Sequence, residues 1–152
     1  MKGQDEKIKK EMQKWMVNLG QNYNVCLTFQ FNKDRITENE AKCAVRVAFG
    51  TLYREILGRK WHNRKSEQYS FIGFQEMGKS GMNRHYHFML KAEKINFCTF
   101  YKLNYFLNKG VKKVVPSAKV KVDPMYNANW GAYIAKEVNS DNNTLMTEDD
   151  FR

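Results

Sequence analysis

Hydrophobic and polar residues alternate in several short stretches of the chain. The alternation is clearest in Asn24–Phe31, where Leu27, Phe29 and Phe31 are separated by polar side chains. Successive side chains of a strand point to opposite faces, so this pattern predicts a half-buried β-strand. Apolar runs bounded by polar or glycine-containing stretches predict further strands at Tyr69–Gln75, Arg84–Lys91 and Lys119–Val122.

Elsewhere apolar residues recur every three or four positions, which predicts helices around these strands. The second of them begins at a capping box, Thr37–Glu40, and Gly58 ends it. Gly110 is expected to stop the third helix in the same way. The other predicted helices are Glu6–Leu19, Asn96–Asn108, and a last one from Asn127 or Asn129 to about Val138.

The predicted order is β-α-β-β-α-β, with one extra helix at each end. This is the split βαβ pattern of ferredoxin-like folds. We therefore expect an α+β fold, with a central antiparallel sheet, flanking helices and an additional N-terminal helix. A chain of 152 residues is long enough for one domain with its own core. We expect that domain at residues 1–138 and a polar tail or the start of a linker at residues 139–152.

Lysine and arginine outnumber aspartate and glutamate by 26 to 16, which gives a net charge of +10. Such a charge favours an anionic partner, nucleic acid or an acidic membrane surface, although it also serves solubility. Aromatic residues lie among or near the basic clusters, a combination that suits single-stranded nucleic acid. For the N-terminal cluster the alternative is solvated charge on the surface of a helix. The clusters are Lys7–Lys14, Arg59–Lys65 and Lys112–Lys121.

The cellular compartment is indicated by the cysteines and by the absence of long apolar runs. The three cysteines show no Cys-x-x-Cys spacing, which disfavours a disulfide framework and a zinc knuckle. A reducing, cytoplasmic compartment is therefore expected. No apolar run approaches membrane-spanning length. Of the two kinds of anionic partner, we expect nucleic acid and no membrane.

His85 and His87 are separated by a single residue in the third predicted strand. Side chains two positions apart share a face, so both imidazoles can bind one metal ion. Glu76 closes the preceding strand, and a hairpin can place it opposite the histidines; a shift of one residue would place Gln75 there instead. The set suits a divalent ion, Mn²⁺ or Mg²⁺. The alternative is an ordinary half-buried strand beside an exposed carboxylate.

Tyr133 and Lys136 lie three residues apart in the last predicted helix, and hence on one side of it. A tyrosine near a metal ion can attack phosphorus and form a covalent phosphotyrosine. The lysine would position the phosphate or stabilise the phenolate. The alternative is a surface tyrosine at the edge of the core beside a solvated lysine. Tyr126 falls before the helix and is given no catalytic role.

Gly73–Ser80 satisfies the pattern G-x-x-x-x-G-K-[ST] of nucleotide-binding loops. Such a loop needs a helix that opens at its lysine. Here Lys79 is followed by Ser80, Gly81 and another predicted strand. We therefore expect no nucleotide cofactor, and we place Lys79 at a hairpin tip within reach of a DNA backbone.

Taken in order, these motifs resemble the HUH endonuclease family, whose members include replication initiators that nick single-stranded DNA. The resemblance covers roughly Asn24–Val138: an apolar strand at Leu27–Phe31, the paired histidines with an acidic residue before them, and Tyr-x-x-Lys on a helix. The first motif lacks paired asparagines, a helix precedes the usual first strand, and we expect no helicase domain after it. The single tyrosine is more similar to small plasmid and viral initiators, or transposases of the family, than to two-tyrosine initiators.

The resemblance implies a sequence-specific endonuclease and strand transferase that starts rolling-circle replication of a plasmid or phage. Its substrate would be single-stranded DNA at an origin or hairpin, in the bacterial cytoplasm or, for a virus, in the host nucleus. Tyr133 would form a 5′-phosphotyrosine and free a 3′-hydroxyl, with Lys136 beside it and a metal ion on Glu76, His85 and His87. Further DNA contacts are expected at Thr28, Gln30, Lys79, Arg84 and Asn129.

Two functions of other classes stay open. A non-catalytic module could bind single-stranded nucleic acid through aromatic residues on a ferredoxin-like sheet, without metal and without a covalent product. A metal-dependent hydrolase with a bound water as its nucleophile would need the metal ligands but would tolerate the loss of Tyr133.

Overall fold

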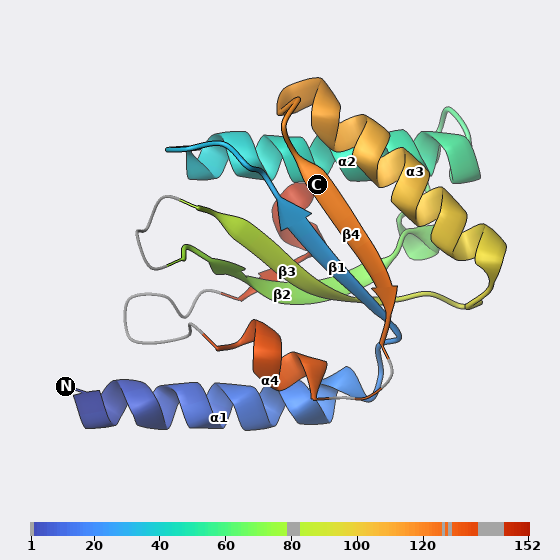
Figure 1. Cartoon of the computed structure of the whole chain (residues 1–152). Helices are drawn as coiled ribbons and strands as arrows, with labels where there is room; N and C mark the ends of the chain where they lie inside the picture. The colour runs from blue at the N-terminus through green and yellow to red at the C-terminus, as the bar shows by residue number, and fades with distance from the viewer. Residues whose placement is uncertain (1, 79–82, 126, 128, 137–144) are drawn as a thin grey trace.

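The computed structural model describes residues 2–78, 83–125, 127, 129–136 and 145–152. Within these residues the chain forms a five-stranded antiparallel sheet with helices on both faces (Figure 1). No helix in this part of the chain is both long and apolar enough to span a membrane. The helices are α1 (Lys2–Gly20), α2 (Glu38–Leu57), α3 (Phe97–Val114) and α4 (Trp130–Ile134). The strands are β1 (Val25–Gln30), β2 (Ser70–Glu76), β3 (His85–Lys91), β4 (Lys119–Pro124) and β5 (Met146–Thr147).

The strands lie in the order β4-β1-β3-β2-β5 across the sheet. The first four strands, with α2 and α3 between them, confirm the α+β fold and the split βαβ pattern expected from the sequence. The extra N-terminal helix is also present, as α1. Two short 3-10 turns, Trp61–Asn63 and Lys65–Glu67, occupy the basic connection before β2.

The two faces of the sheet are covered by different helices (Figure 1). Helices α2 and α3 pack on one face and enclose the larger core, to which β3 contributes Tyr86, Phe88 and Leu90. Helices α1 and α4 lie on the other face, over a small apolar cluster that includes Phe74 and Met89. Because side chains alternate along a strand, His85 and His87 of β3 point to this second face.

Local signals explain where α2 begins and why α3 runs further than expected. The Thr37 hydroxyl accepts a hydrogen bond from the Glu40 backbone amide at 3.1 Å, which caps α2. The prediction that Gly110 stops α3 is wrong: the helix continues to Val114. A Cβ at Gly110 would lie 2.5 Å from Ala48 Cα of α2, so this glycine permits close packing of the two helices.

The last predicted helix is shorter than expected, because α4 ends at Ile134.

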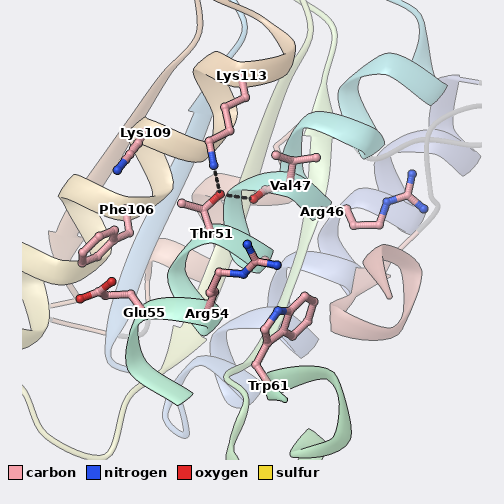
Figure 2. A pocket seen from close by; sticks show the side chains of 10 residues that line it. Arg46, Val47, Thr51, Arg54, Glu55, Trp61, Phe106, Lys109 and Lys113 are labelled. Carbon is pink, nitrogen blue, oxygen red and sulfur yellow. Dashed lines mark hydrogen bonds between the residues drawn. The ribbon is translucent and has the colours of Figure 1, made fainter. Parts of the chain in front are cut away.

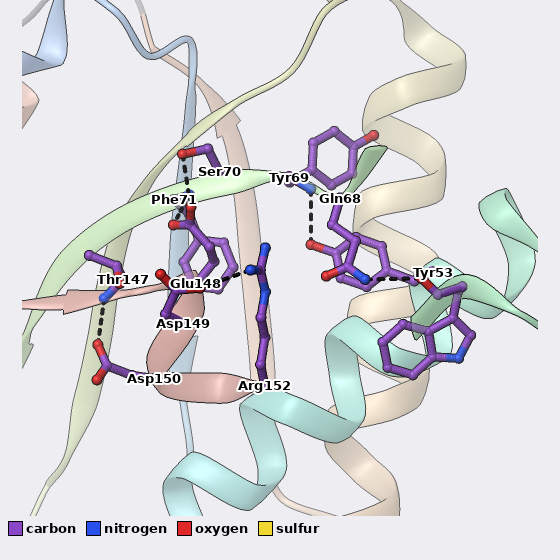
Figure 3. Close-up of polar contacts among 11 residues, drawn as sticks. Tyr53, Gln68, Tyr69, Ser70, Phe71, Thr147, Glu148, Asp149, Asp150 and Arg152 are labelled. Atoms are coloured by element: carbon purple, nitrogen blue, oxygen red, sulfur yellow. Dashed lines mark hydrogen bonds and ion pairs between the residues drawn. The ribbon is translucent and has the colours of Figure 1, made fainter. Parts of the chain in front are cut away.

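The prediction of a polar tail from residue 139 is wrong for residues 145–152, which belong to the fold. Met146 pairs with β2, and the Phe151 ring is buried 5.6 Å from that of Phe88. Figure 3 shows the polar contacts of this segment. Glu148 Oε2 accepts a hydrogen bond from the Phe71 backbone amide, with 3.2 Å between nitrogen and oxygen. Residues 139–144 of the expected tail lie outside the described residues.

Candidate active site

Strand register places Glu76, His85 and His87 on one face of the sheet. His85 of β3 pairs directly with Glu76 of β2, and His87 pairs with Phe74. Residues that face each other across an antiparallel pair share a side of the sheet. The carboxylate and both imidazoles therefore project towards the face covered by α1 and α4.

The same register decides between Glu76 and Gln75. Gln75 pairs with Tyr86, which points to the opposite face of the sheet. There its side-chain oxygen accepts a hydrogen bond from Arg84 Nη1 at 2.5 Å. Glu76 is consequently the residue that shares a face with the histidines, and Gln75 does not take its place.

The three side chains are close enough to hold a single cation. Each offers one ligand atom, and these atoms all lie within 4.8 Å of one another. Glu76 Oε2 is 2.5 Å from His87 Nε2. Two imidazole nitrogens with one carboxylate suit a first-row divalent ion such as Mn²⁺ and leave positions for water or substrate. Mg²⁺ prefers oxygen ligands, so the donor set fits Mn²⁺ more closely.

Thr28 of β1 contacts the His87 ring at Nδ1, the nitrogen that does not face Glu76. Its hydroxyl oxygen lies 3.2 Å from His87 Nδ1, and the residue is only 8% exposed. Nε2 contacts Glu76 in this structure; if a metal ion took the place of the proton on Nε2, Nδ1 would carry the ring proton and donate it to the threonine oxygen. The side chain therefore orients a candidate ligand instead of facing the surface, where the DNA contact expected from the sequence would be made.

The protonation states favour cation binding. Partial burial acts to raise the pKa of Glu76, but hydrogen bonds from Lys136 and His87 outweigh it, so the pKa lies below its ordinary value. Burial lowers the pKa of His87, although the Glu76 carboxylate acts in the opposite direction. At neutral pH the site thus presents an ionised carboxylate and a neutral imidazole, the forms that bind metals.

Tyr133 of α4 and Lys136, two residues after this helix ends, both lie next to this group. Lys136 Nζ lies 3.0 Å from Glu76 Oε1 and 3.4 Å from the Tyr133 hydroxyl, to which it donates. The Tyr133 ring is 5.8 Å from the His87 ring and 45% exposed, so its hydroxyl remains accessible to a substrate. The tyrosine and lysine singled out in the sequence therefore lie beside the candidate cation site.

The charge of Lys136 is kept by its neighbours. Burial acts to lower the pKa of this amine, but hydrogen bonds to Glu76 and Tyr133 raise it above its ordinary value. The amine therefore stays a cation beside the Tyr133 hydroxyl, where it can bind a phosphate. The arrangement suits a tyrosine that must act as a nucleophile.

Trp130 is a site residue that sequence reasoning placed only in the apolar core. Its ring stacks on Tyr133 with centroids 4.7 Å apart, and it also lies 6.1 Å from the His87 ring. The spacing of three residues between Trp130 and Tyr133 was the available signal, because it places both on one side of a helix. Trp130 therefore forms a wall that fixes the orientation of the tyrosine.

The N-terminal helix supports α4 from below. A Cβ at Gly131 would lie 2.3 Å from the Met16 carbonyl oxygen of α1, so only glycine permits this approach. Gln13 Nε2 donates a hydrogen bond to the Ala132 carbonyl at 3.1 Å, and Ile134 is buried in the same cluster as Met16. Helix α1 thus positions the helix that carries Tyr133.

The other residues expected to contact DNA fall in different places. Gln30 is half-buried and pairs with His85, in the same row as the candidate ligands. Asn129 is exposed and, with Tyr133, lines a pocket of about 330 Å³. Arg84 is turned to the other face of the sheet, away from the group. Lys79 lies outside the described residues, as does Tyr126.

The glycine that opens the Gly73–Ser80 motif has a packing role. Gly73 lies within β2, and a Cβ there would lie 1.7 Å from the His87 carbonyl oxygen of β3. A side chain at this position would push apart the two strands that carry the candidate ligands. Close backbone approach therefore explains this glycine without a phosphate-binding loop.

Comparisons with models of known protein families, with curated proteins and with solved structures give no match to this chain. The structure shows an α+β fold with a five-stranded antiparallel sheet and a Glu/His/His group, in which His87 is buried and the other two residues are half-buried.

Proposed function

We propose that this protein nicks and rejoins single-stranded DNA through a covalent bond to Tyr133, with a divalent cation held by Glu76, His85 and His87. The observation that carries the proposal is the position of Lys136, whose amine contacts both Glu76 Oε1 and the Tyr133 hydroxyl. One cation-binding carboxylate and one nucleophile are thereby joined through a single lysine. The wider role, initiating rolling-circle replication of a plasmid or phage, or transposition, rests on the order of the motifs.

The residues of the chain would divide the chemistry as follows. A bound divalent ion would polarise the scissile phosphodiester. Tyr133 Oη loses its proton to solvent and forms a bond to phosphorus, while Lys136 stabilises the phenolate charge. The bond between phosphorus and the 3′ oxygen breaks, and that oxygen takes up a proton from water. The products are a 5′-phosphotyrosine and a free 3′-hydroxyl, and the reverse reaction rejoins the strand.

The first test needs no knowledge of the target sequence. The protein is incubated with Mn²⁺ and a single-stranded DNA pool of random sequence, and covalent complexes are isolated under denaturing conditions. We expect a protein–DNA adduct whose attached DNA begins at a defined sequence. The matched control is Tyr133→Phe, which keeps the ring and removes only the hydroxyl, and which should bind DNA but give no adduct.

A recovered target oligonucleotide, labelled separately at each end, then separates the mechanisms. The 5′-labelled fragment should run free with a 3′-hydroxyl, and the 3′-labelled fragment should migrate with protein. If both fragments run free and Tyr133→Phe still cuts, the enzyme uses water as its nucleophile. If DNA binds and nothing is cut in any metal, the protein is a binding module.

The cation site is tested without DNA, by calorimetry with Mn²⁺. His85→Ala and His87→Ala should each weaken Mn²⁺ binding strongly, because either variant leaves only two ligands. His62→Ala is the matched control, since His62 lies in the 3-10 turn after α2, away from the candidate ligands. Unchanged Mn²⁺ affinity in both site variants would remove the histidines from the site.

A further inference from the structure

The outer surface of α3 carries a ladder of exposed aromatic rings. Phe97, Tyr101 and Tyr105 are 86%, 56% and 49% exposed. Their spacing of four residues stacks them along the helix, with centroids 6.3 Å and 5.9 Å apart and the two tyrosine planes within 10° of parallel. Large rings left in solvent in a contiguous row usually mark an interaction surface.

The same row continues into a basic groove between α2 and α3. Lys109 and Lys113 follow Tyr105 at further steps of four residues, and each step turns about 40° around the helix. Both lysines line a pocket of about 510 Å³ between the two helices (Figure 2). Arg46 and Arg54 of α2 also line this pocket.

The groove has a large excess of positive charge. Glu55 is the one carboxylate among its lining residues. Within the described part of the chain, Arg46, Arg54 and Lys109 take part in no ion pair. Helix α3 itself contains four lysines and no acidic residue: FCTFYKLNYFLNKGVKKV. These unpaired cations call for an anionic partner.

We infer that this surface, the aromatic ladder with the basic groove, binds a single strand of DNA independently of the metal site. Bases that are free of a partner strand stack on exposed aromatic rings, and the phosphates would be neutralised by the groove. A duplex keeps its bases inside and would leave the rings unused. A single strand is the anionic partner that uses both features.

The surface is distinct from the candidate active site. Helices α2 and α3 cover one face of the sheet (Figure 1). The strand register places Glu76, His85 and His87 on the other face. Exposed Lys119 and Lys121 of β4 carry positive charge along the sheet edge between the two regions. The inference thus goes beyond the proposed nicking reaction and does not depend on it.

The rings are tested by fluorescence anisotropy of a labelled oligothymidylate in the presence of EDTA, which removes divalent ions. The variant Tyr101→Ala/Tyr105→Ala should bind at least about tenfold more weakly than the wild-type protein. The matched control, Tyr101→Phe/Tyr105→Phe, keeps both rings and should bind within about twofold of wild type. Equal binding by all three proteins would overturn the inference.

The groove is tested by the salt dependence of the same binding. Lys109→Glu/Lys113→Glu removes two phosphate contacts, so the slope of log affinity against log salt should become less steep by about 1.4. Lys2→Glu/Lys91→Glu makes the same change of charge at exposed positions outside the basic clusters and should leave the slope nearly unchanged. Equal changes in both variants would mean that net charge alone drives binding.

Two further outcomes are distinguishable. Sedimentation that shows a wild-type dimer and a monomeric ring variant, with unaltered DNA binding, would assign the ladder to a second copy of this chain and overturn the inference. The adduct assay with Tyr133 separates this question from the proposed function. If the ring variant loses DNA binding but the wild-type protein forms no adduct, only the nicking reaction is refuted. If the wild-type protein forms an adduct but the ring variant binds DNA as well as wild type does, only the binding surface is refuted.

Discussion

The two faces of the sheet are built for different purposes. On the face under α2 and α3, rings of Phe29, Phe71 and Phe88 pack against one another, with Phe71 and Phe88 centroids 5.0 Å apart. On the face under α1 and α4, the apolar cluster is small and adjoins the row of Glu76, His85 and His87. Adjacent residues of one strand, His87 and Phe88, serve the two purposes.

This difference shows how a small fold can keep a polar site in a stable molecule. Burial of apolar area on the first face supplies most of the stabilisation. The second face can then contain ionisable groups, which contribute little to stability unless they are paired or bound to metal. Each change below should affect one face more than the other.

The largest effect is expected from Phe88→Ala in the larger core. Phe88 is fully buried and contacts several aromatic rings, so the loss should be about 3–5 kcal/mol of unfolding free energy. Phe74→Ala makes the same substitution in the small cluster and should cost less, because α1 and α4 can close over the cavity. Urea denaturation followed by circular dichroism gives both values, and equal losses would contradict the division between faces.

Metal binding should stabilise only the second face. Mn²⁺ at about one hundred times its Kd should raise the unfolding free energy by about 2.7 kcal/mol. Hydrogen exchange should slow in β2 and β3 next to the cation, and α2 should gain little protection short of global unfolding. The Glu76→Gln variant should show neither change. If Mn²⁺ raised the unfolding free energy of that variant as much as that of wild type, the ion would bind elsewhere.

Gly131→Ala should separate the nucleophile from the cation site. The new Cβ would meet the Met16 backbone oxygen, so α4 must move, at a cost of about 1–3 kcal/mol. Adduct formation through Tyr133 should fall, while calorimetry should show Mn²⁺ affinity unchanged because the ligands lie on β2 and β3. Gly3→Ala is the control, since a Cβ there meets nothing within 4 Å. Normal adduct yield in Gly131→Ala would show that α4 tolerates displacement.

The smallest effect is expected from Thr28→Val, which replaces the hydroxyl near His87 Nδ1 by a methyl group. Loss of the group that orients the ring should lower Mn²⁺ affinity about tenfold, or about 1.4 kcal/mol. Thr28→Ser restores a hydroxyl and should restore most of the affinity. If Val and Ser behave alike in calorimetry, the threonine does not orient the ligand.

Local patterns in the sequence were sufficient to predict β1, β2, β3 and β4, and to single out the two histidines, Tyr133 and Lys136. Alternation predicted β1, and the spacing of His85 and His87 placed both imidazoles on one face. The choice between Glu76 and Gln75 needed the register of β2 on β3, which depends on contacts distant in sequence. The role of Thr28 needed the register of β1 on β3 for the same reason, and no local signal contains it.

Other errors arose where one residue type serves several purposes. Glycine is common just after the end of a helix, so Gly110 was predicted to end α3. In the structure it lies inside α3, where the lack of a side chain permits close packing against α2. Phe151 is a single apolar residue among acidic neighbours, and such a residue gives no periodicity from which burial could be predicted. Its burial follows from the pairing of β5 with β2, which is again a long-range contact.

Helix α4 stands between two strands that lie at opposite edges of the sheet, since β4 precedes it and β5 follows it. The part of the chain between these two edge strands includes α4, which lies over one face of the sheet and carries Tyr133 (Figure 1). A DNA end attached to that tyrosine would be tethered over the sheet and could not diffuse away from it. For as long as the 3′-hydroxyl end also stays bound to the protein, rejoining would be an intramolecular event, governed by the effective concentration of the two ends and not by their concentration in solution.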